Sequence, residues 1–132
     1  MIRFNAMNEI TIFGYVEKVL ALAQKRYAEV RNRNLHSPVL QMYDSIGKQS
    51  IFLRDLIEGK EKDESKLWKM TFGMYAVKEL DNSDELFFER LSNAWFIVGQ
   101  IRCGLKVRLP HEVDANYVIK QQNLKMKYPD EF

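Results

Sequence analysis

The chain has 132 residues, of which 46% are hydrophobic and 29% are charged, values that fit one folded domain and exclude an intrinsically disordered chain. Its formal net charge of +2 is too small to indicate nucleic-acid binding by itself. No apolar run approaches the roughly 20 residues that a membrane-spanning helix needs.

Two long helices are predicted in the first half, at about residues 8–33 and from Pro38 up to Gly59. In the first, apolar residues recur at steps of three and four, which predicts one buried stripe. These residues are Ile12, Val16, Val19, Ala23, Tyr27 and Val30. Ser37 is a good N-cap for the second helix, Pro38 suits its first position, and Gly59 is a natural end.

Two more helices are predicted after the charged loop at residues 60–65. Apolar residues surround the third, at about residues 64–80, so we expect it to be central in the fold. Its Trp68, Phe72 and Tyr75 should lie in the core beside Trp95 of the fourth helix. The fourth helix follows the turn at residues 81–84 and ends near Gly104.

Residues 105–110, with the sequence LKVRLP, alternate apolar and basic side chains. This pattern predicts a short extended segment that Pro110 closes, with its leucines and valine facing the helices and its two cations facing outward. A last short helix is expected to start at Asp114, before a loose C-terminal end.

Together these elements predict an all-α, single-domain, mostly antiparallel bundle of about four main helices with a short extended C-terminal segment. Residues 1–110 are expected to form the bundle. Residues 111–132 are expected to form an extension that either packs on the bundle or trails from it.

Each predicted main helix contains an interior glycine: Gly14, Gly47, Gly73 and Gly99. An interior glycine costs a helix about 1 kcal/mol relative to alanine, so four of them need a reason. Close packing between helices is the interpretation that we favour. The alternative is that the glycines form the walls of a groove for a small molecule.

The run RNRNLHSP at residues 31–38 holds Arg31, Asn32 and His36. The spacing Arg-Asn-x-x-x-His resembles the ribonuclease motif of HEPN domains, which are small all-helical proteins. The resemblance implies a metal-independent ribonuclease in which Arg31 stabilises phosphate charge and His36 assists proton transfer. The alternative interpretation, which we favour, is a polar turn before a helix that starts at Ser-Pro.

Residues 42–70 are predicted to form a helix, a charged loop and another helix, an arrangement that resembles the all-α nucleoside triphosphate pyrophosphohydrolases. Those enzymes bind magnesium through carboxylates on facing helices. Here the corresponding positions hold no carboxylate cluster; they are Ser45, Lys48, Gln49, Lys69, Met70 and Gly73. The resemblance therefore implies at most a relative that has lost catalysis. Two histidines and one cysteine also do not make a usual zinc site, and we expect no metal and no cofactor.

The function that we favour is a small non-catalytic interaction or regulatory protein, of cellular or mobile-element origin, that binds another macromolecule. Bases predominate from Arg102 to Lys127, and we predict that Arg102, Lys106 and Arg108 contact the partner. A protein is the expected partner, and a homodimer or a nucleic acid are further candidates. A lone Cys103 and the lack of a secretory signal pattern at the start predict a cytoplasmic location.

Overall fold

The structure is a computed structural model, and it describes residues 11–33, 38–75 and 84–132. In these residues it is all-α, as predicted, with no strand. Its elements are α2 (Ile12–Arg33), α3 (Pro38–Ile57), the 3₁₀ helix η1 (Glu64–Lys69), α4 (Phe72–Tyr75), α5 (Glu85–Arg102), α6 (Pro110–Val113), α7 (Tyr117–Lys127) and the 3₁₀ turn η3 (Pro129–Glu131). Nothing in the described part of the chain is long and apolar enough to be a bilayer-crossing helix.

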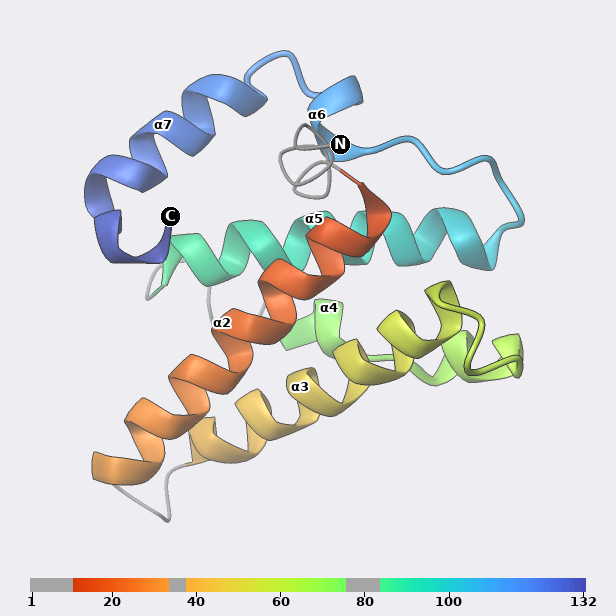
Figure 1. Ribbon diagram of the computed structural model, residues 1–132, viewed down its shortest axis with the longest axis horizontal. Coiled ribbons are helices and arrows are strands. Elements are labelled where there is room, and N and C mark those ends of the chain that lie inside the picture. Colours follow the sequence, from red (N-terminus) through yellow and green to blue (C-terminus); the bar gives the residue numbers. More distant parts are fainter. Residues whose placement is uncertain (1–10, 34–37, 76–83) are drawn as a thin grey trace.

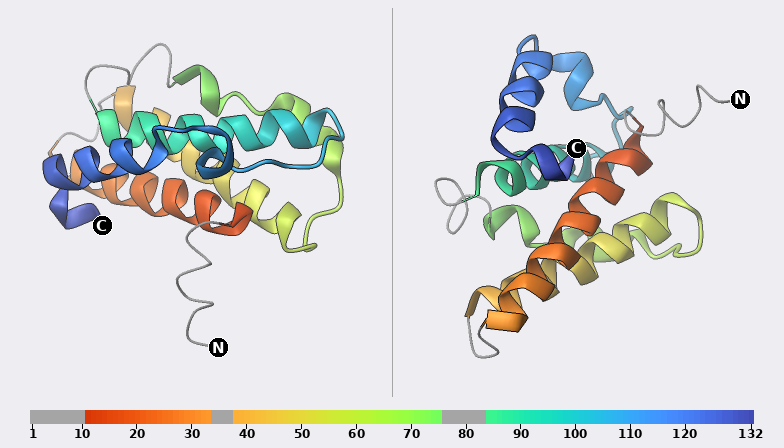
Figure 2. Two further views of the ribbon diagram at one scale, coloured as in Figure 1. Left: turned by 90° about the horizontal axis from the view of Figure 1, so that it is seen from above. Right: turned by 60° about the vertical axis from the view of Figure 1, so that its left-hand side comes forward.

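The three long helices α2, α3 and α5 form the centre of the molecule. α3 runs back antiparallel to α2, and α2 crosses over α5 (Figures 1 and 2). The apolar stripes of these helices meet in one core, as the three- and four-residue spacing predicts. Its fully buried side chains include Val16, Val19, Leu22, Ile46, Leu53, Phe87, Leu91 and Val98. Between α3 and α5 the rings of Tyr43 and Phe87 stack with their centroids 5.1 Å apart.

Glycines in the left-handed backbone region end both α3 and α5. Gly59 has a φ of +82° and Gly104 a φ of +67°, which side chains with a Cβ rarely adopt. Backbone bonds close each end, from Lys60 N–H to the Asp55 carbonyl at 2.8 Å and from Leu105 N–H to the Gln100 carbonyl at 3.0 Å. The predicted ends of these two helices are confirmed.

The predicted third helix is wrong as one continuous element. The chain forms η1, passes through an extended Met70 with a ψ of 135°, and then starts the short α4. Gln49 of α3 accounts for this break, because its Oε1 accepts hydrogen bonds from Thr71 N–H at 2.8 Å and Phe72 N–H at 3.1 Å. The backbone groups that a continuous helix would use internally are thus satisfied from another helix.

The aromatic residues of this region divide between the core and the surface. Phe72 is fully buried, as predicted, and Trp95 is partly buried against the core. The prediction for Trp68 is wrong, because its side chain is 66% exposed. The predicted burial of Tyr75 and the rest of the predicted helix, residues 76–80, lie outside what the structure describes.

The interior glycines do not share one role. At Gly73 an added Cβ would lie 2.2 Å from the Trp95 indole, so close packing is confirmed there. At Gly47 and Gly99 an added Cβ would meet nothing within 4 Å, so the packing interpretation is wrong for both. Gly14 lines an open groove of about 690 Å³ between α2 and the C-terminal end of the chain.

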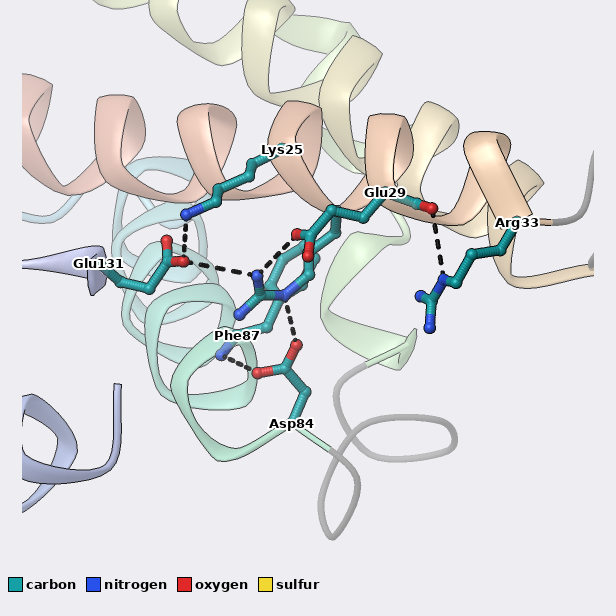
Figure 3. Close-up of polar contacts among 7 residues, drawn as sticks. Lys25, Glu29, Arg33, Asp84, Phe87 and Glu131 are labelled. Atoms are coloured by element: carbon teal, nitrogen blue, oxygen red, sulfur yellow. Dashed lines mark hydrogen bonds and ion pairs between the residues drawn. The ribbon is translucent and has the colours of Figure 1, made fainter. Parts of the chain in front are cut away.

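The C-terminal part folds back over α2 and α5 (Figure 1). Residues 105–109 contain no helix, as expected, but Leu105 is 60% exposed and does not face the bundle. The predicted helix start at Asp114 is also wrong, since α6 ends at Val113 with Asp114 as its C-cap and α7 begins at Tyr117. The expected loose end is instead the turn η3, where Glu131 forms ion pairs with Lys25 and Arg26 (Figure 3).

Candidate protein-binding surface

Two tryptophans and an arginine meet where η1 lies against the C-terminal end of α5. The guanidinium carbon of Arg102 lies 4.6 Å from the ring centroid of Trp95 and 5.4 Å from that of Trp68. A cation over an aromatic face within about 6 Å is attracted by the ring electrons. We call these three residues, together with the exposed Lys69 beside Trp68, the tryptophan–arginine surface.

Arg102 is fixed in this position by the backbone of the segment that the sequence predicted as one helix. Its Nε donates to the Leu67 carbonyl at 2.7 Å and its Nη2 donates to the Met70 carbonyl at 2.9 Å. These carbonyls lie at the end of η1, where the Leu67 carbonyl also accepts a hydrogen bond from Met70 N–H at 3.3 Å. Arg102 therefore donates hydrogen bonds to the backbone where η1 ends and at the same time presents a positive charge at the surface.

Trp95 is held from beneath by α4. Its ring meets the ring of the buried Phe72 edge-on, with centroids 5.5 Å apart and planes at 64°. The absence of a side chain at Gly73 makes room for the indole. The inner tryptophan is thus firmly placed, whereas Trp68 covers the arginine from the solvent side.

Several cations lie in this surface or follow it along the chain. Lys69, Lys106 and Arg108 are exposed, and no ion pair to any of them or to Arg102 occurs within the residues that the structure describes. Many other cations of the chain do have carboxylate partners, as Lys66 does with Glu61 at 3.2 Å. Unpaired surface cations attract acidic partners.

The sequence-predicted contact residues fall into two kinds. Lys106 and Arg108 follow α5 on the exposed connection to α6, where Gln100 holds the backbone of Arg108 through two bonds of 2.8 Å. Arg102 is partly buried by its internal contacts. That these three residues contact a partner stays a prediction. Trp68 was missed as a surface residue, although its position between Lys66 and Lys69 was a signal of exposure.

The residues of the HEPN-like motif are described only in part. Arg31 and Asn32 are exposed in the last turn of α2, and His36 lies outside the described residues. The nuclease alternative is therefore not tested by the geometry. Among the residues that the structure does describe, no group of three or more histidine, cysteine or acidic side chains is placed to hold a metal ion.

A second polar cluster lies where α2 meets the start of α5 (Figure 3). The Nε of Arg26 donates to Asp84 at 2.9 Å, and its Nη1 donates to Glu29 at 3.0 Å. Burial alone would lower the pKa of Arg26, but the bond to Asp84 and the nearby acids raise it above its ordinary value. Asp84 also caps α5 by accepting from Phe87 N–H at 3.2 Å, so this cluster joins helices.

The chain is similar to known proteins over most of its length. A family model described as Tsi6 matches residues 11–100. The immune protein Tsi6 of Pseudomonas aeruginosa is 31% identical over 101 residues, which are 76% of this chain and 100% of that protein. A solved structure of Tse6 in complex with Tsi6 matches with a TM-score of 0.66 and 31% identity, covering 76% of this chain and 99% of the matched one. These similarities fit the predicted non-catalytic, protein-binding role.

Proposed function

Because the chain belongs to the Tsi6 family, we propose that it is an immunity protein that binds a protein related to Tse6. The observation that carries the proposal is the match to the Tsi6 of a complex, at 31% identity and a TM-score of 0.66. An immunity protein protects the cell that makes it by occupying a harmful protein. This role requires a stable surface and no catalytic group.

The fold suits such a role. A core built from three long helices holds the surface residues in fixed positions, so little flexibility is lost on binding. Although the net charge is only +2, the charged side chains are unevenly distributed along the chain. Bases without an ion pair in the described residues lie near the end of α5 and would attract an acidic partner. We place the complex in the cytoplasm, in agreement with the expectation from the sequence.

The direct test is binding between this chain and the Tse6-related protein of the organism that encodes it. Isothermal titration should give a Kd below about 1 μM, which corresponds to roughly −8 kcal/mol. Protection of cells against the Tse6-related protein should require about one equivalent of this chain per equivalent of that protein, since a binder acts stoichiometrically and an enzyme does not. An unrelated small all-α protein is the control. The absence of any heat of binding between this chain and the Tse6-related protein at tens of micromolar would contradict the proposal.

The same purified chain tests the two further partners that the sequence suggests. Sedimentation of the wild type and of the Lys106→Glu/Arg108→Glu double variant, at low and high salt, detects a homodimer formed through the basic connection. Adding a labelled RNA detects nucleic-acid binding, and its cleavage in EDTA, lost in His36→Ala, would favour the nuclease alternative instead.

A further inference from the structure

We propose that the tryptophan–arginine surface is the docking site for an acidic, partly apolar surface of the partner protein. The inference rests on the proposed function and adds where the partner binds and what chemistry it presents. It is drawn from the exposure of Trp68, the fixed position of Arg102 and the unpaired charges around them.

The exposure of Trp68 is unusual for so large an apolar side chain. Its side chain is 66% exposed, although Phe72, four residues later, is fully buried. Tryptophan and arginine are the residue types most enriched among those that carry protein–protein binding energy, and here they are stacked on each other. Burial of the free face of Trp68 by a partner would remove this apolar area from water.

The surface is already ordered before any partner arrives. Two backbone carbonyls fix the guanidinium of Arg102, and the Phe72 ring and the close contact with Gly73 fix Trp95. A contact built on fixed side chains costs less entropy than one that must order them. This is the property expected of an anchor for a protein partner.

The charges select the chemistry of that partner. Lys69 and Arg102 lie in the surface, and Lys106 and Arg108 follow on the chain directly after α5. None of these four cations has an ion pair within the residues that the structure describes, so they can attract carboxylates on another protein. The occupant is therefore an acidic surface with an apolar portion that covers Trp68.

Another exposed apolar region lacks this support. α7 exposes Val118, Ile119 and Met126, but it lies after the residues that the family model matches. Figure 1 places α7 at the opposite end of the molecule from the end of α5. In the tryptophan–arginine surface, Trp68, Lys69 and Trp95 lie within residues 11–100 and Arg102 lies two residues beyond, so most of this surface belongs to the part that the family shares.

The test compares two variants of the surface with a matched control. Trp68→Ala removes the exposed ring, and Lys69→Glu reverses a charge that has no ion pair in the described residues. Met126→Ala is the control, because it removes an 82% exposed apolar side chain from α7. Each variant is titrated against the Tse6-related protein, with circular dichroism and thermal unfolding to verify the fold.

We expect Trp68→Ala to weaken binding by about 30-fold or more, as for a side chain at the centre of an interface. Lys69→Glu should weaken it several-fold, with less dependence on salt than the wild type shows. Met126→Ala should bind as the wild type does. Wild-type binding that both surface variants retain would overturn the docking site alone, whereas a wild type that does not bind would overturn the proposed function and the site with it.

Discussion

Gly73 shows at the scale of one residue why an interior glycine stands in α4. The ring atoms Cδ2, Cγ and Cε2 of Trp95 lie 2.2–2.4 Å from the position that a Cβ at Gly73 would take. These atoms lie near the base of a bulky ring that Phe72 and Arg102 also contact, so the ring has little room to move. Space for the indole, and not backbone freedom, is the reason for this glycine.

We therefore expect Gly73→Ala to lower the free energy of unfolding by about 1–3 kcal/mol, the usual cost of overpacking. Gly99→Ala is the matched control, because Gly99 is exposed in α5 and a Cβ there meets nothing within 4 Å. Alanine at that position should stabilise the protein by about 0.5–1 kcal/mol. Urea unfolding followed by circular dichroism measures both changes. If the two substitutions changed the free energy of unfolding in the same direction, this account would be contradicted.

At the scale of the elements, Gln49 decides where α4 begins. Its amide oxygen accepts from Thr71 N–H and Phe72 N–H, and its Nε2 donates to Ser45 Oγ at 3.0 Å and to Thr71 Oγ1 at 3.3 Å. One side chain of α3 thus caps a helix that starts 23 residues later in the sequence. The start of α4 consequently depends on α3 being in place.

Replacing Gln49 by alanine should lower the free energy of unfolding by about 1–3 kcal/mol, since two backbone N–H groups lose their acceptor. Gln41→Ala, an exposed glutamine on the same helix, should change it by less than about 0.5 kcal/mol. Chemical denaturation gives both values. Equal effects of the two substitutions would mean that the cap contributes nothing beyond the loss of a glutamine side chain.

The contrast between α2 and η1 shows which elements a sequence can predict. α2, α3 and α5 each carry an apolar stripe with helical spacing, and α3 and α5 end at the predicted glycines, so their local pattern and their packing agree. The segment at residues 64–75 has an equally apolar pattern, but Gln49 and Arg102, distant in sequence, satisfy its backbone in another conformation. Local periodicity contains no information about such partners.

The candidate surface also has features that the sequence predicts and features that it does not. The positive charge around Arg102, Lys106 and Arg108 was predicted, because charge is a property of the residues themselves. The stacking of Arg102 between Trp68 and Trp95 was not, since it requires the break after η1 that turns Trp68 outward. The protein-binding role was nonetheless predicted and is supported by the family.

At the scale of the whole molecule, the C-terminal segment joins residues that are far apart in the chain. The Tyr15 hydroxyl lies 2.8 Å from His111 Nδ1, and burial raises the pKa of this phenol, which keeps it protonated at neutral pH. Leu124 of α7 is buried in the main core. The segment after residue 100, which the family model does not match, is thus part of the same folded unit.

Glu131 anchors the far end of this segment on α2 and α5. Its carboxylate bonds to Lys25 and lies 3.7 Å from Arg26 (Figure 3). Its backbone carbonyl accepts from Arg90 Nη2 at 2.9 Å. Burial raises the pKa of Glu131, but the Lys25 bond and the charges of Arg26, Lys25 and Arg90 outweigh it, so the net shift is downward. A carboxyl with a lowered folded pKa stabilises the fold above its ordinary pKa and loses that contribution as the pH falls.

Glu131→Gln should therefore lower the free energy of unfolding by about 1 kcal/mol at pH 7, because the ion pairs of a largely buried carboxylate are lost. The difference from the wild type should shrink as the pH falls below about 4.5, the ordinary pKa of a glutamate, and should vanish once the pH lies well below the lowered pKa of Glu131, where the wild-type carboxyl is also neutral. Asp130→Asn, at the exposed neighbouring position, is the control and should differ from the wild type by less than about 0.5 kcal/mol throughout. Urea unfolding at several pH values measures the three curves, and a difference for Glu131→Gln that stays constant over the whole acid range would show that its charge does not hold the segment in place.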